Sequence, residues 1–249
     1  MGEALGQGHY GIVRKAVNRK TGKLYAVKII PKWKVENPEL VMTEIEILRK
    51  LDHPNVIKYI ETIEDYDTYY IVMELCNGGE LFDRIIDTEH KLSLVRIARI
   101  TTQILRGVQH CHENGIVNRD IKSENVLFKT KDPESQIKVI DFGLSAIYSD
   151  HDNLHARVGT VFYMSPEVRS LSVEFENIFL SFIQSYFNTH FVVRETTQLT
   201  LVFFNMVTIK PLEYFTRART QVLAKNYTTK CDIWSVGILL YVMLSRSVA

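Results

Sequence analysis

The stretch IVNRDIKSENVL, residues 116–127, is the most informative part of this chain, and the triplet Asp141-Phe142-Gly143 follows sixteen residues after Asn125. A polar loop that contains ordinary acidic residues is the simplest alternative. That alternative does not account for the other motifs that stand in order around this stretch. Because a chance occurrence of all of them in order is negligible, we take residues 116–143 as the centre of a functional site.

A glycine-rich motif lies upstream, at residues 6–13, where GQGHYGIV matches the pattern G-x-G-x-x-G-x-V. The glycine turn of a dinucleotide-binding domain has the same spacing, and a glycine-rich hairpin without a ligand would also fit. A dinucleotide-binding turn opens a helix, whereas here a second strand follows and ends at Ala26-Val27-Lys28. We therefore expect a flap over phosphates, in which Gly6, Gly8 and Gly11 let backbone N–H groups approach and Lys28 reaches beneath.

Lys28 has a predicted partner on a helix. Pro38 precedes apolar residues spaced near i, i+3, i+4 and i+7, with Pro54 as the stop, and this spacing predicts an amphipathic helix. Glu44 lies on that helix, where its carboxylate would hold the Lys28 ammonium toward phosphates. A solvated surface lysine is the alternative, and Glu46 is expected to point to solvent.

With these motifs the chain resembles a eukaryotic protein kinase, because it contains the R-D-x-K-x-x-N loop and the D-F-G triplet of that family. The resemblance implies an α+β, two-lobed protein-kinase-like fold with a β-rich N-lobe and a helical C-lobe. It implies that Asp120 orients a substrate hydroxyl and accepts its proton, and that Lys122 offsets charge on the γ-phosphate. ATP would be the phosphate donor, and Asn125 and Asp141 would hold Mg²⁺. Phosphoryl transfer suits these residue types because negative charge develops on the moving group.

The resemblance also implies a nucleotide pocket with an apolar sandwich around adenine, a gatekeeper and a hinge. The sandwich would be Val13, Ala26 and Leu127, the gatekeeper Met73, and the hinge Glu74 and Cys76. An inert buried thiol would serve equally at Cys76, because only its backbone is used. The full set of residues expected at the nucleotide is Leu5, Gly6, Gly8, Gly11, Val13, Ala26, Lys28, Glu44, Met73, Glu74, Cys76 and Leu127.

Three further segments suggest a subfamily. ELCNGGELFD at residues 74–83, RVGT at 157–160 and YMSPEV at 163–168 are similar to calcium- and calmodulin-regulated kinases, most closely the calcium-dependent group. In that group Glu80 and Glu124 meet arginines upstream of the target Ser or Thr, so protein substrates with basic residues there are expected; plain surface carboxylates are the alternative. Thr160 resembles the residue that tells Ser/Thr kinases from tyrosine kinases.

Some positions depart from the family's pattern. Asn118 stands where the family usually has a histidine that packs against Phe142, and Ala156 stands where many relatives are phosphorylated. We therefore expect activation to depend on a calcium-sensing regulatory module or a calmodulin-like partner supplied outside this chain. The chain has no EF-hand loop of its own. A catalytically weak or inactive kinase fragment that acts as a nucleotide-binding or regulatory module is the alternative function.

Composition and charge exclude several classes of protein. The 249 residues include 30 Lys and Arg against 29 Asp and Glu, so the net charge of +1 gives no support to a nucleic-acid partner. No apolar run is long enough to span a membrane, and we expect no membrane association. Three widely spaced cysteines fit neither a disulfide framework nor a zinc site. A reducing compartment is expected, namely the cytoplasm, with the nucleus as the alternative.

The chain divides into four predicted parts: the N-lobe at 1–76, the first part of the C-lobe at 77–168, an atypical insertion at 169–222, and an anchor helix at 223–249. Residues 169–222 contain no Gly and no Asp, but eight of the twelve Phe. Joining residue 168 to 223 restores the family's pattern and makes Asp232 the helix anchor beneath the catalytic loop. We prefer a translated intron as the origin of the insertion, with a genuine family-specific insert as the alternative. Because the family's last helices do not follow Ala249, we expect a C-lobe truncated at the C-terminus.

Overall fold

The structure of the protein is a computed structural model. It describes residues 1–8, 11–148, 154, 156, 158–160, 162–164 and 228–248, with only the backbone described for 246–248. The predicted insertion at 169–222 and the sequence SPE at 165–167 lie outside the described residues, as does the beginning of the part predicted at 223–249.

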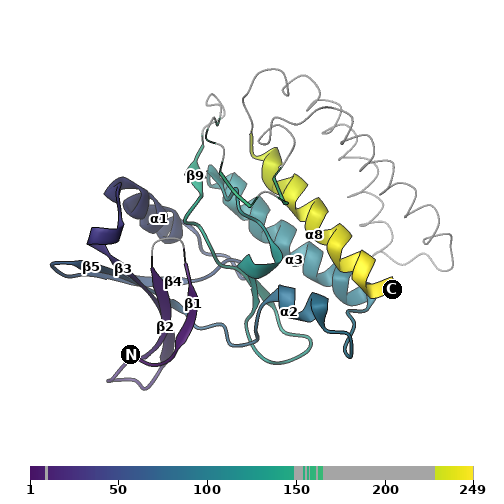
Figure 1. The fold of residues 1–249 in the computed structure, drawn as a ribbon, viewed down its shortest axis with the longest axis horizontal. Helices are drawn as coiled ribbons and strands as arrows, with labels where there is room; N and C mark the ends of the chain where they lie inside the picture. The colour runs from purple at the N-terminus through teal and green to yellow at the C-terminus, as the bar shows by residue number, and fades with distance from the viewer. Residues whose placement is uncertain are drawn as a thin grey trace.

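The N-terminal part of the chain forms a five-stranded antiparallel sheet (Figure 1). Its strands are β1 (Ala4–Gln7), β2 (Ile12–Val17), β3 (Leu24–Pro31), β4 (Tyr59–Glu64) and β5 (Thr68–Glu74), in the order β1-β2-β3-β5-β4. The chain turns between β2 and β3 at Gly22, which has a φ of 69°. Glycine adopts this left-handed conformation without the steric cost of a Cβ. A 3-10 turn, Lys32–Lys34, follows β3.

Helix α1 (Pro38–Lys50) begins where the sequence predicts. The Asn37 side chain accepts a hydrogen bond from the N–H of Glu39, and Pro38 occupies the first turn, where a missing N–H costs nothing. The buried residues of α1 are Val41, Glu44, Ile45, Ile47 and Leu48. A carboxylate on an otherwise apolar face requires a buried partner, and α1 is the element that carries Glu44 into the site.

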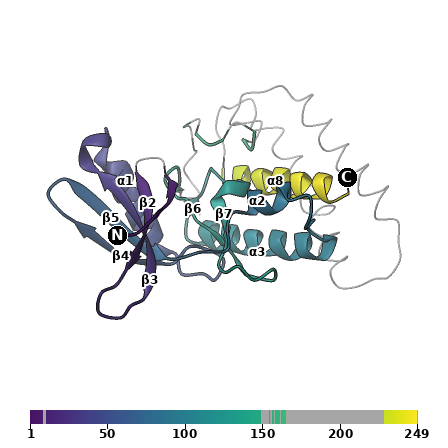
Figure 2. The same cartoon turned by 60° about the horizontal axis from the view of Figure 1, so that its bottom comes forward.

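Helices dominate the rest of the described chain. They are α2 (Leu81–Ile86), α3 (Leu94–Glu113) and α8 (Lys230–Val248), and α3 lies beside α8 in both views (Figures 1 and 2). Ser93 caps the start of α3, because its side chain accepts a hydrogen bond from the N–H of Arg96. Gly115, with a φ of 67°, follows the end of the helix.

Short strands bring the two central motifs together. Strand β6 (Ile116–Val117) pairs with β9 (Ala146–Ile147), and β7 (Val126–Phe128) pairs with β8 (Ile137–Val139). A 3-10 turn, η2 (Ser123–Asn125), leads into β7. The N–H of Ile140 donates to the carbonyl of Asn125 at 3.0 Å. Residues 118–125 and 141–143 therefore lie side by side.

One hydrophobic core runs through both halves of the described chain. It includes Ile45 of α1, Ile104 of α3, Leu239 and Met243 of α8, and Phe142, each at most 3% exposed. This is the two-lobed α+β arrangement that the sequence predicts. No helix in the described ranges is both long enough and apolar enough to cross a bilayer.

Candidate functional site

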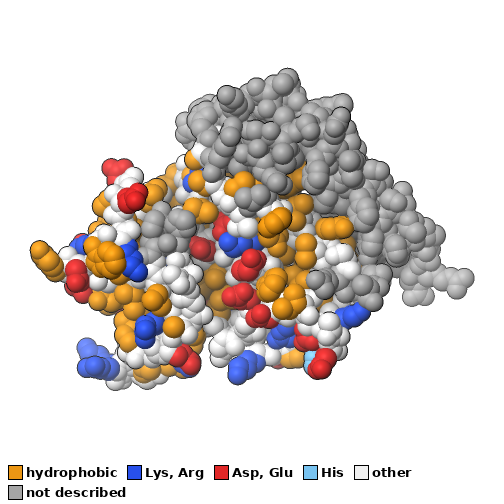
Figure 3. Space-filling model, in the orientation of Figure 1, with side chains coloured by type: hydrophobic (Ala, Val, Ile, Leu, Met, Phe, Trp, Pro, Cys, Tyr) orange, Lys and Arg blue, Asp and Glu red, His pale blue; other side chains and the backbone are white. Residues whose placement is uncertain are grey.

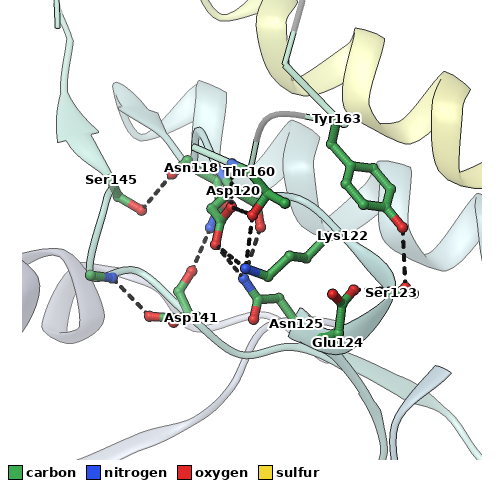
Figure 4. Close-up of polar contacts among 11 residues, drawn as sticks. Asn118, Asp120, Lys122, Ser123, Glu124, Asn125, Asp141, Ser145, Thr160 and Tyr163 are labelled. Atoms are coloured by element: carbon green, nitrogen blue, oxygen red, sulfur yellow. Dashed lines mark hydrogen bonds and ion pairs between the residues drawn. The ribbon is translucent and has the colours of Figure 1, made fainter. Parts of the chain in front are cut away.

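Asp120 is the centre of a dense hydrogen-bond network (Figure 4). Its Oδ1 accepts hydrogen bonds from the N–H of Thr160 at 3.0 Å and from the Thr160 hydroxyl at 2.6 Å. Its Oδ2 accepts one from Nδ2 of Asn125 at 2.9 Å and lies 2.8 Å from Nζ of Lys122. Lys122 also donates to the Thr160 hydroxyl at 2.9 Å. The network fixes the orientation of a carboxylate that is only 7% exposed.

Asp232, on α8, anchors the backbone of this loop from below. Its Oδ2 accepts a hydrogen bond from the N–H of Asn118 at 2.9 Å, and its Oδ1 accepts one from the N–H of Arg119 at 2.7 Å. Nε2 of His112 lies 2.9 Å from Oδ2. Asp232 is completely buried, and these contacts satisfy the carboxylate. Arg119 has a φ of 69°, which is uncommon for a residue with a Cβ, and the anchor holds it in that conformation.

Asn118 connects the two motifs of the site. Its Nδ2 donates a hydrogen bond to the carbonyl oxygen of Asp141 at 2.8 Å, and its Oδ1 accepts one from the N–H of Asp120 at 3.1 Å. The side chain is 1% exposed, as is that of Phe142. An amide at this position therefore links both loops while Phe142 stays in the core.

The predicted pair of Lys28 and Glu44 is present. Nζ of Lys28 lies 2.5 Å from Oε1 of Glu44, and both side chains are about 95% buried, with 5% and 4% exposure. Oε2 of Glu44 is buried and accepts no hydrogen bond from a described residue. Glu46 is exposed and forms a surface pair with Lys50, which agrees with its predicted position.

The glycines around Lys28 leave room for a phosphate. A Cβ added at Gly8 would lie 3.1 Å from Cε of Lys28, and one at Gly143 would lie 3.7 Å from both Nζ of Lys28 and Oε2 of Glu44. Side chains there would fill the space around the ammonium. The residues present thus fit the phosphates of ATP.

Two other glycines of the motif differ in what surrounds them. A Cβ at Gly11 would lie 2.0 Å from the carbonyl oxygen of Ile29, so the chain itself requires glycine at this position. A Cβ at Gly6 would have no described atom within 4 Å. Leu5, beside Gly6, is 43% exposed on β1.

Strand register brings the predicted adenine residues of the N-lobe together. Val13 pairs with Lys28, and Ala26 pairs with Met73. Residues that face each other across strands share a face, as do residues two apart on one strand. Val13, Ala26, Lys28 and Met73 therefore lie on one face of the sheet. Leu127 comes from the other lobe, on β7, and its backbone forms an isolated antiparallel β-bridge with that of Glu80.

The end of β5 is tied to the second lobe by a buried ion pair. Nζ of Lys138, on β8, lies 2.5 Å from Oε1 of Glu74 and donates to the carbonyl of Val56 at 3.0 Å. The N–H of Glu74 donates to the carbonyl of Lys58. Burial, together with the Glu74 carboxylate, raises the pKa of the Cys76 thiol to about 12, so this thiol is neutral and unreactive at physiological pH.

Carboxylates gather on the face between the sheet and the helices (Figure 3). Burial raises the pKa of Glu80, and the nearby carboxylates of Asp83 and Glu124 raise it further. Glu80 and Glu124 are therefore close enough to interact. The sequence predicts that these two residues contact arginines of a basic substrate. Repulsion among like charges favours a cationic ligand at this place.

The oxygen donors for Mg²⁺ are few. In the described part of the chain, no cluster of three or more His, Cys, Asp or Glu side chains is suited to a metal ion. Mg²⁺ usually binds through one or two protein carboxylates and takes its other ligands from water and phosphate. Asn125 uses its Nδ2 toward Asp120, which leaves its side-chain oxygen, Oδ1, as a candidate ligand together with the carboxylate of Asp141. These donors fit Mg²⁺ held together with a nucleotide.

The sequence did not identify three residues that support this site: Ser123, Lys138 and His112. For Lys138 a signal existed, because a lysine inside the apolar run of β8 must have a buried partner. Ser123 and His112 lie in polar surroundings in the sequence, and only the tertiary contacts reveal their partners.

Comparison with known proteins agrees with this geometry. The family model "Protein kinase domain" matches residues 1–174. The chain is 33% identical over 240 residues to "Calcium-dependent protein kinase 5" of Plasmodium berghei (strain Anka), an alignment that covers 96% of this chain and 33% of the relative. It is 36% identical over 245 residues to "Calcium-dependent protein kinase 3" of Plasmodium yoelii yoelii, with 97% and 35% covered.

A plant relative is equally similar. The chain is 36% identical over 251 residues to "Calcium-dependent protein kinase 25" of Arabidopsis thaliana, with 99% of this chain and 38% of the relative covered. It thus spans about a third of the length of the curated relatives that it matches. On the match of the family model, which covers residues 1–174, the chain belongs to the protein kinase family.

Proposed function

We propose that this chain is the catalytic domain of a Ser/Thr protein kinase, which transfers the γ-phosphate of ATP to protein substrates with basic residues upstream of the target. One observation carries the proposal: the carboxylate of Asp120 is held by Lys122, Asn125 and Thr160 at 2.6 to 3.0 Å. A base that is fixed in this way can orient a hydroxyl without reorganisation during the reaction.

The residues of the chain would divide the chemistry among them. Mg·ATP, when bound, supplies the phosphoryl group and neutralises part of its charge. Asp120 orients the substrate hydroxyl and accepts its proton, while Lys122 offsets negative charge on the transferred group. Lys28, held by Glu44, would bind the phosphates of ATP, and Asn125 and Asp141 would hold Mg²⁺.

Phosphorylation of an arginine-containing serine peptide tests the proposal. Asp120→Asn keeps the size of the side chain but cannot accept the proton, so we expect kcat to fall about 10²- to 10⁴-fold. The Mg·ATP-dependent shift in melting temperature should persist, because Asp120 does not hold the nucleotide. Asp52→Asn, a change at a largely exposed carboxylate, is the control and should leave kcat unchanged. Full activity of Asp120→Asn would contradict the assignment.

Regulation by calcium is part of the proposal. The relatives are named calcium-dependent protein kinases, and we propose that a calcium-sensing region or a calmodulin-like partner outside this chain activates it. The alternative is a nucleotide-binding or regulatory module without transferase activity. Mg·ATP binding without phosphate transfer, with and without added calcium and calmodulin, would favour that alternative.

A further inference from the structure

Ser123 lies between the side chains of Glu124 and Tyr163 (Figure 4). Its hydroxyl donates a hydrogen bond to Oε2 of Glu124 at 2.7 Å, and the hydroxyl of Tyr163 lies 3.2 Å from its Oγ. A serine hydroxyl has one proton, and Ser123 uses it in the hydrogen bond to Glu124. In the second contact the Tyr163 hydroxyl is therefore the donor and Oγ of Ser123 the acceptor. A relay of hydrogen bonds therefore runs from Tyr163 through Ser123 to Glu124, and we call it the Ser123 relay.

The far end of the Ser123 relay is fixed by the fold. The main-chain carbonyl of Tyr163 accepts a hydrogen bond from Oγ of Ser235, on α8, at 2.8 Å, and its N–H donates to the carbonyl of Thr160 at 2.9 Å. The Tyr163 ring packs against the hydrophobic core, and Ser123 is 1% exposed. Consecutive hydrogen bonds strengthen one another in such buried surroundings. The contact with α8 thus fixes Tyr163, and the Ser123 relay in turn fixes one oxygen of the half-buried Glu124.

The other carboxylate oxygen of Glu124 is available to a ligand. Within the described ranges, Oε1 of Glu124 has no hydrogen bond, and neither Glu124 nor its neighbours Glu80 and Asp83 form an ion pair. Three carboxylates without a described cationic partner favour a positively charged group between them. A guanidinium suits this arrangement, because it donates several hydrogen bonds in one plane.

We propose that Ser123 is a positioning residue for substrate specificity: with Tyr163, it holds Oε2 of Glu124 so that Oε1 meets the guanidinium of an arginine upstream of the target. The inference rests on the proposed function, because Glu124 contacts a substrate only if the chain binds one. Without the Ser123 hydroxyl, the carboxylate rotates among its rotamers, and the contact with arginine must fix it at an entropic cost.

A binding measurement tests this role separately from catalysis. Two peptides with Ala at the acceptor position, one with upstream arginines and one with citrulline at the same places, are titrated against the chain by fluorescence anisotropy. Citrulline keeps the shape of arginine without its charge. In Ser123→Ala we expect the ratio of the two affinities to fall about fivefold, which is the typical entropic cost of fixing one flexible side chain on binding. Tyr163→Phe, which keeps the ring, should lower it by about twofold, since the Ser123 contact itself remains.

Two further variants complete the test. The double variant Ser123→Ala/Tyr163→Phe should lower the ratio no more than Ser123→Ala alone, because both residues act through one relay. Ser135→Ala is the matched control: Ser135 is also buried and its hydroxyl also makes two hydrogen bonds, but it lies on the turn between β7 and β8. This variant should keep the ratio of the parent chain.

The outcomes separate the two proposals. An equal loss of affinity for both peptides in Ser123→Ala, or an unchanged ratio, would overturn the role of Ser123. Equal binding of both peptides to the parent chain would overturn it as well, because Glu124 would then read no charge. If the ratios change as expected but no phosphate is transferred to a serine peptide, the positioning role is supported and the proposed transferase function fails.

Discussion

The side-chain amide of Asn118 donates a hydrogen bond to the carbonyl oxygen of Asp141 at 2.8 Å. The same amide accepts a hydrogen bond from the N–H of Asp120 through its oxygen. One neutral side chain therefore bridges the predicted base and the predicted metal ligand. The usual histidine of the family can gain a proton near neutral pH, whereas an amide does not titrate.

Replacing Asn118 by Asp tests this bridge, because the shape is kept while the donor becomes an acceptor. Asn118→Asp would place a carboxylate oxygen against the carbonyl of Asp141, and we expect the free energy of unfolding to fall by about 1–3 kcal/mol in urea denaturation. The Mg·ATP-dependent rise in melting temperature should shrink, since Asp141 is held less firmly. Asn114→Asp, on the exposed end of α3, is the control. Equal stability of the two variants would contradict the bridge.

The pair of Lys28 and Glu44 allows a test that separates stability from nucleotide binding. Lys28→Met leaves a buried carboxylate without its cation, so the free energy of unfolding should fall by about 3–5 kcal/mol. Lys28→Met/Glu44→Leu should regain much of that stability, but Mg·ATP binding measured by calorimetry should remain lost.

The surface pair of Glu46 and Lys50 is the matched control for that test. Lys50→Met should cost less than about 1 kcal/mol, because the pair is hydrated in the parent chain and the remaining Glu46 carboxylate stays hydrated in the variant. If the double variant at positions 28 and 44 were as unstable as Lys28→Met alone, the uncompensated Glu44 carboxylate would not be the cause of the loss.

Asp232→Asn tests the anchor beneath the loop. One oxygen becomes an NH₂ group that faces the N–H of Asn118 or of Arg119, so a hydrogen bond to a charged group is lost at a cost of about 2–3 kcal/mol. The amides of residues 118 and 119 should then exchange hydrogen faster, as mass spectrometry can measure. Asp132→Asn, at an exposed turn, should leave the exchange of these two amides unchanged.

The His53 ring predicts a dependence of stability on pH. It stacks on His110, with centroids 5.1 Å apart, and its Nδ1 accepts a hydrogen bond from the N–H of Asn55. Burial lowers the pKa of His53, and His110, Lys138 and Arg106 lower it further, whereas Glu113 opposes them. Since the folded-state pKa lies below the ordinary 6.5, the unfolded state binds more protons in acid. The free energy of unfolding should therefore fall as the pH is lowered from about 7 to 5.

His53→Asn removes this titration and keeps an acceptor for the N–H of Asn55. We expect urea denaturation between pH 5 and 7 to give a flatter profile for this variant than for the parent chain. His90→Asn, at a side chain that is 80% exposed, should keep the slope of the parent. A slope that His53→Asn leaves intact would assign the acid sensitivity to other groups.

Much of the fold follows from local signals in the sequence. The Ser93 cap, the turn at Gly22 and the amphipathic face of α1 depend on residues within a few positions of each other, and all three are present. The pairing of Lys28 with Glu44 was predicted because the two lie on successive elements. The strands β6 and β9, of two residues each, are too short to show a period and could not be predicted.

Contacts between distant segments account for what the sequence did not reveal. Ser123 and Tyr163 are 40 residues apart within the C-lobe, and Glu74 and Lys138 are 64 apart and lie in different lobes, so only tertiary packing brings each pair together. A lysine in a buried strand indicates that an acidic or polar partner must be present, but which residue is the partner depends on the tertiary structure.

Gly6 and Gly11 belong to one motif, but different requirements exclude side chains at the two positions. At Gly11 a Cβ would clash with the carbonyl oxygen of Ile29. In a library of single variants sorted for folding alone, every substitution at Gly11 should therefore be depleted. At Gly6 no described atom sets such a limit. Enrichment of glycine at position 6 should therefore appear only when the library is sorted for nucleotide retention. A deep mutational scan with both sorts would show which residues of the glycine motif are required for folding and which are required for nucleotide binding.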